Sequence, residues 1–193
     1  MKAKEQAARY LVKSKKYTYQ DYLNLPDDGK SYEVINGELI MVAAPYTIHQ
    51  IISGNIEDEM RAFLKKTPMG IMIHSPIDVV LSNTNIVQPD IIFISRDNSS
   101  IMEEKNINGI PDVIIEILSP STAYYDMIEK KEIYEKLGVK EYWIVDTKKE
   151  SVEIFLNVNY SFELKQKIVT KGFAKSYIMK GFEVSLERIF HLY

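Results

Sequence analysis

Two periodicities of hydrophobic residues divide this chain into helices and strands. An Asn36-Gly37 pair stands between the strand-like runs SYEVI and ELIMVA, which predicts a β-hairpin. Segment 47–66 carries apolar residues at spacings of three and four, which predicts one long helix. This stripe consists of Ile48, Ile52, Ile56, Met60 and Phe63. Segment 17–25 predicts a shorter helix that ends before Pro26, and the lysine-rich residues 1–16 predict a helical extension.

The rest of the chain alternates strand-like runs with one further helix. The runs at 71–82, 86–95, 111–119, 141–146, 151–157 and 161–169 predict strands, and 176–190 predicts a last strand with a short helix. Segment 122–137 predicts a helix that stops at Gly138, while 96–110 is polar and typical of a loop. The unit 111–146 should therefore be a right-handed parallel crossover. We expect a single α/β domain over 1–193: a mixed β-sheet flanked by helices, with an N-terminal β-hairpin.

Composition excludes several classes of protein. Hydrophobic residues make up 46% of the 193 positions and charged residues 26%, as in ordinary globular domains. No apolar run approaches the roughly 20 residues of a membrane helix, and the N-terminal residues lack a secretory core, so a cytoplasmic location is expected. The absence of cysteine excludes disulfides and thiolate chemistry. A net charge of −3 argues against a bulk cationic nucleic-acid binder, although a cluster of metal-binding carboxylates can make a nuclease acidic.

Glu116 is a charged residue inside the apolar run DVIIEIL. Strand alternation puts it on one face with Ile114 and Leu118. A buried ionised carboxylate is costly unless it is paired or bound to a metal. An edge strand that exposes Glu116 to water is the alternative, but apolar residues on both faces of the run favour burial. The pattern therefore indicates a metal ligand in an active site.

Two further polar residues lie where apolar ones are expected. Asp90 directly precedes the apolar run IIFIS, but a second Pro-Asp pair at 111–112 shows that such a pair can equally cap a loop. Lys130 falls near the centre of the apolar face of the helix predicted over 122–137. From there it could reach over the strand that holds Glu116. Alternatively, its ammonium extends outward to water or pairs with Asp126 one turn earlier.

Two other polar residues have weaker support from the pattern. His49 lies beside the apolar stripe of the long helix, where a lone histidine is more often a hydrogen-bonded core residue than a catalytic one. Glu33 flanks the predicted hairpin turn, so solvent exposure is expected. Glycine-rich phosphate loops, GxSxG and HExxH motifs are absent, and three scattered histidines give a zinc site little support.

Two acids on neighbouring strands with a lysine nearby resemble the PD-(D/E)XK nuclease superfamily, with Asp90 in its PD and Glu116 as the second acid. The superfamily pattern has a lysine where this chain has Leu118. A narrower resemblance, from position 17 to about 155, is to the Uma-two family of restriction endonucleases. It is carried by YEVINGEL, IHQ, VQPDIIFIS, GIPDVIIEILSPST and EYWIVD. In that family the lysine stands on the following helix, which Lys130 matches.

The resemblance implies an endonuclease that hydrolyses DNA phosphodiester bonds. It implies Asp90, Glu116 and Lys130 as the catalytic core, and it adds His49 and Glu33 as recurring polar positions. DNA is the implied substrate, and a homodimer would suit cleavage of both strands of a duplex.

The implied cofactor is Mg²⁺ or Mn²⁺, because hard divalent cations prefer oxygen ligands. One or two ions would be held by Asp90, Glu116 and the main-chain carbonyl of Ile117. Lys130 would orient the attacking water or stabilise the developing charge. Two alternatives stay open: a catalytically inactive nuclease fold that binds DNA or protein, and a hydrolase of smaller phosphodiesters. The sequence does not distinguish DNA from RNA.

Overall fold

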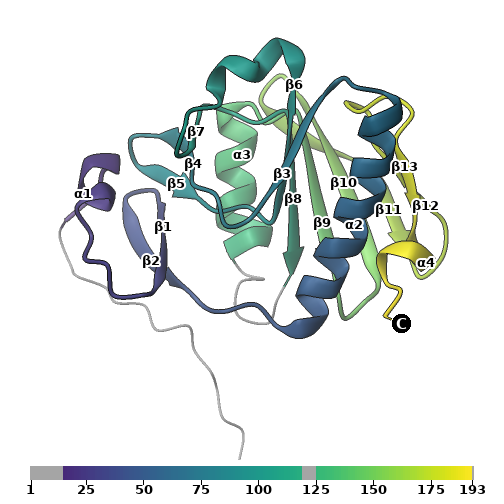
Figure 1. The fold of residues 1–193 in the computed structure, drawn as a ribbon, viewed down its shortest axis with the longest axis horizontal. Helices are drawn as coiled ribbons and strands as arrows, with labels where there is room; N and C mark the ends of the chain where they lie inside the picture. Colours follow the sequence, from purple (N-terminus) through teal and green to yellow (C-terminus); the bar gives the residue numbers. More distant parts are fainter. Residues whose placement is uncertain (1–14, 119–124, 193) are drawn as a thin grey trace, which may run out of the picture.

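The computed structural model describes residues 15–118 and 125–192, which form layers of helices and sheets (Figure 1). The helices are α1 (Tyr19–Leu23), α2 (Thr47–Lys66), α3 (Lys131–Leu137) and α4 (Leu186–Ile189), with a 3-10 helix η1 (Arg96–Ile101) and a π-helix η2 (Tyr125–Lys130). The strands are β1 (Ser31–Ile35), β2 (Glu38–Val42), β3 (Gly70–His74), β4 (Val79–Ser82), β5 (Asn85–Val87), β6 (Ile91–Ser95), β7 (Ile107–Asn108), β8 (Val113–Leu118), β9 (Glu141–Asp146), β10 (Ser151–Val158), β11 (Ser161–Val169), β12 (Phe173–Lys175) and β13 (Glu183–Ser185).

The central layer is a six-stranded mixed sheet in the order β11-β10-β9-β8-β6-β3. Strands β8 and β9 pair in parallel, which confirms the parallel crossover predicted over 111–146, and the other neighbours pair antiparallel. Every residue of β8 is buried. Because β8 lies between two other strands and both its faces are covered, its nearly continuous apolar sequence is the one expected.

A second sheet has five strands in the order β2-β1-β5-β4-β7, and the sequence did not predict this division of the strands between two sheets. The run expected as one strand over 71–82 is divided between β3 and β4, and the run over 86–95 between β5 and β6. Pro76 and Pro89 lie at these divisions, and proline has no N–H to donate to a strand ladder. Each run therefore leaves one sheet and enters the other.

Two local predictions are confirmed without change. Helix α2 begins at Thr47 and ends at Lys66, the bounds expected from its apolar stripe. Strands β1 and β2 form the predicted hairpin, with Asn36 and Gly37 at φ 52° and 79°. Both central residues of this turn need a positive φ, which asparagine and glycine adopt at low cost. The helical extension predicted over 1–16 lies outside the described residues except for positions 15 and 16.

Two hydrophobic cores cover the two faces of the six-stranded sheet. One joins α2, α4 and the β12–β13 ribbon to the face that carries Ile115 and Ile117. The other joins α3 and the second sheet to the face that carries Ile114 and Leu118. Strand alternation puts Glu116 on this second face, beneath α3. None of the helices in the described ranges has the length and apolarity needed to cross a membrane.

Candidate active site

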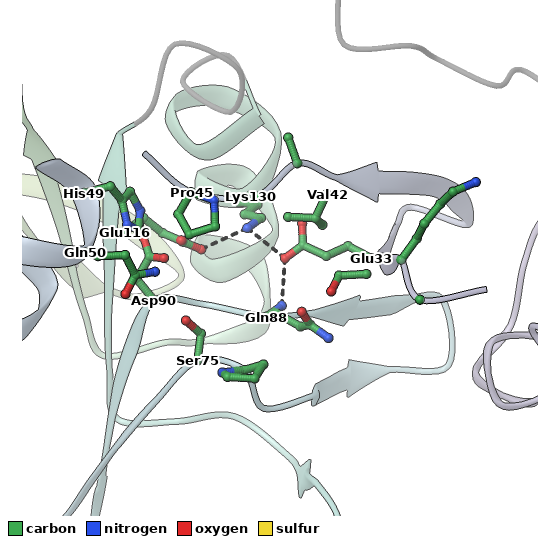
Figure 2. Close-up of a pocket in the computed structure, with 16 residues that line it drawn as sticks. Glu33, Val42, Pro45, His49, Gln50, Ser75, Gln88, Asp90, Glu116 and Lys130 are labelled. Atoms are coloured by element: carbon green, nitrogen blue, oxygen red, sulfur yellow. Dashed lines mark hydrogen bonds and ion pairs between the residues drawn. The ribbon is translucent and has the colours of Figure 1, made fainter. Parts of the chain in front are cut away.

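A cleft of about 590 Å³ opens at the carboxyl end of β8, where the connections between the two sheets meet. It is lined by residues from both sheets, from the start of α2 and from η2, and Figure 2 shows their side chains turned toward one another. The charged or polar residues of interest are Glu33, His49, Gln88, Asp90, Glu116 and Lys130. All five residues predicted as catalytic are therefore brought into one cleft; their catalytic roles stay predictions.

Glu116 is buried, with 2% of its surface exposed, and it is paired. Its Oε1 lies 3.2 Å from the Lys130 ammonium and accepts a hydrogen bond of 2.7 Å from the Tyr134 hydroxyl. Burial and the neighbouring Glu116 carboxylate raise the pKa of Tyr134 well above its usual range, so the hydroxyl keeps its proton and donates. One carboxylate oxygen is thus fixed toward the helix by two donors.

Lys130 stands at the end of η2, directly before α3, and is itself buried. Its ammonium turns inward toward Glu116, and not outward to solvent. Lys130 and Tyr134 lie one helical turn apart, so both reach Glu116 from the same face of the helix. A π-helical turn such as η2 is rare and is frequently found at functional sites. The side chain of Asp126, the alternative partner considered for Lys130, lies outside the described residues.

Glu33 is the residue for which the pattern-based expectation was wrong, since its side chain is buried and not exposed. Its Oε1 lies 2.9 Å from the Lys130 ammonium and accepts a 2.7 Å hydrogen bond from the main-chain N–H of Gln88. Strand β5 ends at Val87, so the N–H of Gln88 lies just beyond the strand and is available to a side chain. Lys130 therefore bridges Glu33 of the five-stranded sheet and Glu116 of the six-stranded sheet.

Asp90 lies just before β6, opposite the end of β8. The pairing of β6 with β8 ends at Ile91 and Ile115, so the N–H of Ile117 lies beyond the paired residues. This N–H donates to Oδ2 of the Asp90 carboxylate, at 2.7 Å. His49 of α2 also lies 3.1 Å from Oδ2 through its Nε2. The N–H and C=O of one strand residue face the same neighbour, so the Ile117 carbonyl is on the Asp90 side. Within residues 15–118 and 125–192, no donor bonds to Oδ1 of Asp90.

These groups match the ligand preferences of magnesium or manganese better than those of zinc. In the part of the chain that the structure describes, no three histidine or acidic side chains converge closely enough to hold a metal by themselves. Magnesium keeps several waters and commonly binds through one or two carboxylates. Asp90, Glu116 and the carbonyl of Ile117 would supply two carboxylates and one neutral oxygen, which fits that coordination.

Two residues of this network were not singled out from the sequence as site residues. The spacing of Tyr134 from Lys130, one helical turn, is the signal that could have identified it, but an apolar helix face also explains a tyrosine. Gln88 contributes a main-chain N–H, which no side-chain pattern reports. Leu118, which stands where the superfamily pattern has lysine, is buried in the core beside α3.

We expect Tyr134→Phe to lower the free energy of unfolding by about 2 kcal/mol, because it removes a buried hydrogen bond to a charged group. Urea unfolding of the two proteins measures this difference. Tyr160→Phe is the matched control, since Tyr160 is largely exposed and its change should stay within about 0.5 kcal/mol. Equal stability of Tyr134→Phe and the wild type would show that the hydroxyl does not help to hold Glu116.

Comparisons with known proteins identify the family and the fold of this chain. A family model described as "Uma2: Putative restriction endonuclease" matches residues 19–184. A solved structure, a putative nuclease belonging to DUF820 from Anabaena variabilis ATCC 29413, is similar with a TM-score of 0.67 and 18% identity, over 90% of this chain and 97% of that one. This likeness confirms the expected α/β fold.

A second solved structure overlaps less. The type IIG restriction endonuclease BpuSI has a TM-score of 0.41 and 13% identity, over 74% of this chain and 15% of that one. That overlap is too limited to indicate a shared fold. No curated protein matches the chain.

Proposed function

The chain belongs to the Uma2 family, whose model is described as a putative restriction endonuclease, and from that premise we propose that it is a metal-dependent endonuclease that hydrolyses phosphodiester bonds of DNA. The observation that carries the proposal is the buried Lys130–Glu116 pair, at 3.2 Å, in a cleft that Asp90 also lines. Two acids and a lysine that converge on one open cleft are the groups that phosphodiester hydrolysis needs.

Asp90 and Glu116 would hold the cation together with the Ile117 carbonyl. A divalent cation bound there would polarise the phosphate and activate water for attack. The Lys130 ammonium would stabilise negative charge that develops on the phosphate oxygens, and its burial makes that interaction stronger than in water. Its position at the end of a packed helix keeps the charge oriented before the substrate arrives.

His49 and Glu33 would act as positioning residues. His49 lies 3.1 Å from Oδ2 of Asp90, the same oxygen that accepts the hydrogen bond from the N–H of Ile117, so the two contacts together hold this oxygen in place. Glu33 holds the Lys130 ammonium at 2.9 Å. Both residues would be needed for full activity, but neither would contact the scissile bond in this arrangement.

The charge of the cleft explains why a cation would be required for a polyanionic substrate. Three carboxylates, Glu33, Asp90 and Glu116, and two lysines, Lys30 and Lys130, line it. With an excess of negative groups, the cleft repels phosphate until a divalent cation supplies local positive charge.

Removal of the metal tests the proposal. We expect the purified protein to cleave single- or double-stranded DNA with Mg²⁺ or Mn²⁺, to lose cleavage in EDTA, and to recover it when the metal is restored. Asp90→Asn should abolish cleavage because a charged metal ligand becomes neutral. Asp97→Asn, an exposed aspartate on η1, should cleave like the wild type.

Two results would contradict the proposal. Cleavage that persists in EDTA would exclude metal dependence. Salt-sensitive DNA binding without cleavage under any metal would indicate a nuclease fold that is used for binding alone. RNA and short phosphodiester substrates in the same assay distinguish a DNA nuclease from the remaining candidates.

A further inference from the structure

The ammonium of Lys130 lies between carboxylates that come from two different sheets. Glu33 Oε1 is 2.9 Å away and Glu116 Oε1 is 3.2 Å away, and all three side chains are buried. Figure 2 shows the order across the cleft: Asp90 and Glu116, then Lys130, then Glu33. Glu116 thus has a candidate metal ligand on one side and a lysine with a third carboxylate on the other.

This order resembles a two-metal site in which the Lys130 ammonium takes the place of one of the two cations. In two-metal hydrolases the ions lie about 3.5–4 Å apart and stabilise the attacking and the leaving oxygens together. Here the first position has Asp90 and Glu116 as ligands. The second position, between Glu116 and Glu33, holds an ammonium 3.2 Å and 2.9 Å from one oxygen of each carboxylate, so the two acids share one positive charge.

The charges lead to the same conclusion. Asp90, Glu116 and Glu33 carry three negative charges, and Lys130 carries one positive charge. One divalent cation neutralises the remaining two. A second cation beside the retained ammonium would leave the buried site with an excess positive charge of two, which costs much more in a region of low dielectric than at the surface. A second cation could therefore enter only by displacing the ammonium.

The structure also indicates that Lys130 is held where it is. Glu33 is anchored by the 2.7 Å hydrogen bond from the N–H of Gln88, and the helix after Lys130 is packed through Tyr134, which is fully buried against Tyr142. For the ammonium to leave, it would abandon two buried carboxylates at once. Displacement of Lys130 by a second metal is therefore disfavoured.

We propose that this protein uses a single divalent cation, and that the Lys130 ammonium occupies the position of a second one. The inference rests on the proposed function in one respect, namely that Asp90 and Glu116 hold a metal. It goes further in stating how many ions bind and which residue excludes the other.

Calorimetric titration with Mn²⁺, without nucleic acid, tests the number of ions. We expect one ion per wild-type chain. Lys130→Met leaves Glu33 and Glu116 facing a position without a cation, so this variant should bind two. The double variant Lys130→Met with Glu33→Gln removes the carboxylate that completes the second position and should bind one again. Lys136→Met, on the exposed side of α3, should bind one like the wild type.

Several outcomes separate this inference from the proposed function. Two ions per wild-type chain would overturn the inference and leave the nuclease proposal intact. No binding to the wild type would overturn the metal-dependent nuclease itself. A single ion in folded Lys130→Met would also overturn the inference. If Lys130→Met is poorly folded without metal, Mn²⁺ should raise its Tm more than that of the wild type, and an equal or smaller rise counts against the inference.

Discussion

Replacement of Glu116 with glutamine is expected to lower the rate of DNA cleavage about 1,000-fold. The variant would bind the cation more weakly and so lose several kcal/mol of the stabilisation that the cation gives to the transition state. The amide oxygen of glutamine can still accept hydrogen bonds from Tyr134 and Lys130, so the local packing is preserved. What is lost is the negative charge offered to the cation. Mn²⁺ should also cease to raise the Tm, since ligation to the native state is the cause of that rise.

The measurement is kcat/KM at saturating Mg²⁺, with Glu132→Gln as the matched control. Glu132 lies close to Lys130 along the chain, but its side chain is 61% exposed and its carboxylate pairs with Lys136. Its replacement should leave cleavage unchanged. Activity of Glu116→Gln within tenfold of the wild type would mean that this carboxylate is not a ligand, whatever its burial.

Lys130→Met is expected to lower the free energy of unfolding by about 4 kcal/mol, because removal of one partner of a buried ion pair leaves uncompensated charge. Two carboxylates are affected here, Glu33 and Glu116, whose side chains are only 6% and 3% exposed. Methionine is close to the lysine stem in shape, so little of the loss should come from packing. Cleavage should be lost as well.

Denaturant unfolding at neutral pH without metal measures this cost. Lys136→Met provides the comparison, because Lys136 is 71% exposed and its pair with Glu132 should contribute no more than about 0.5 kcal/mol. A loss below about 1 kcal/mol for Lys130→Met would place it in the range of surface ion pairs and would contradict the bridging role of the ammonium.

Local signals were sufficient for much of the fold. The apolar stripe fixes the bounds of α2, the Asn-Gly pair fixes the hairpin, and the unbroken apolar run fixes β8 as a central strand. The division into two sheets was not foreseen. Runs 71–82 and 86–95 look like continuous strands because both halves are apolar, and the choice of partner sheet depends on contacts far away in the chain. Only Pro76 and Pro89 marked the divisions.

The candidate site was predictable only where a residue departs from the local hydrophobic pattern. A charge within an apolar strand is a local anomaly, so Glu116 is visible in the sequence, and Lys130 is visible by its place on an apolar helix face. Glu33 has no such anomaly beside its turn, and its burial arises because β1 joins a sheet that packs near η2. Tyr134 also shows no anomaly in the sequence, since a buried tyrosine on a helix is ordinary.

The Lys130 ammonium reaches Glu116 from a helix, so no lysine is needed at position 118. The residue there, Leu118, lies in the hydrophobic core with Ile114 and Tyr134. A sequence motif that requires an acid and a lysine two residues apart does not match this chain at Glu116. A template that records only the distance from an ammonium to a strand carboxylate accepts it.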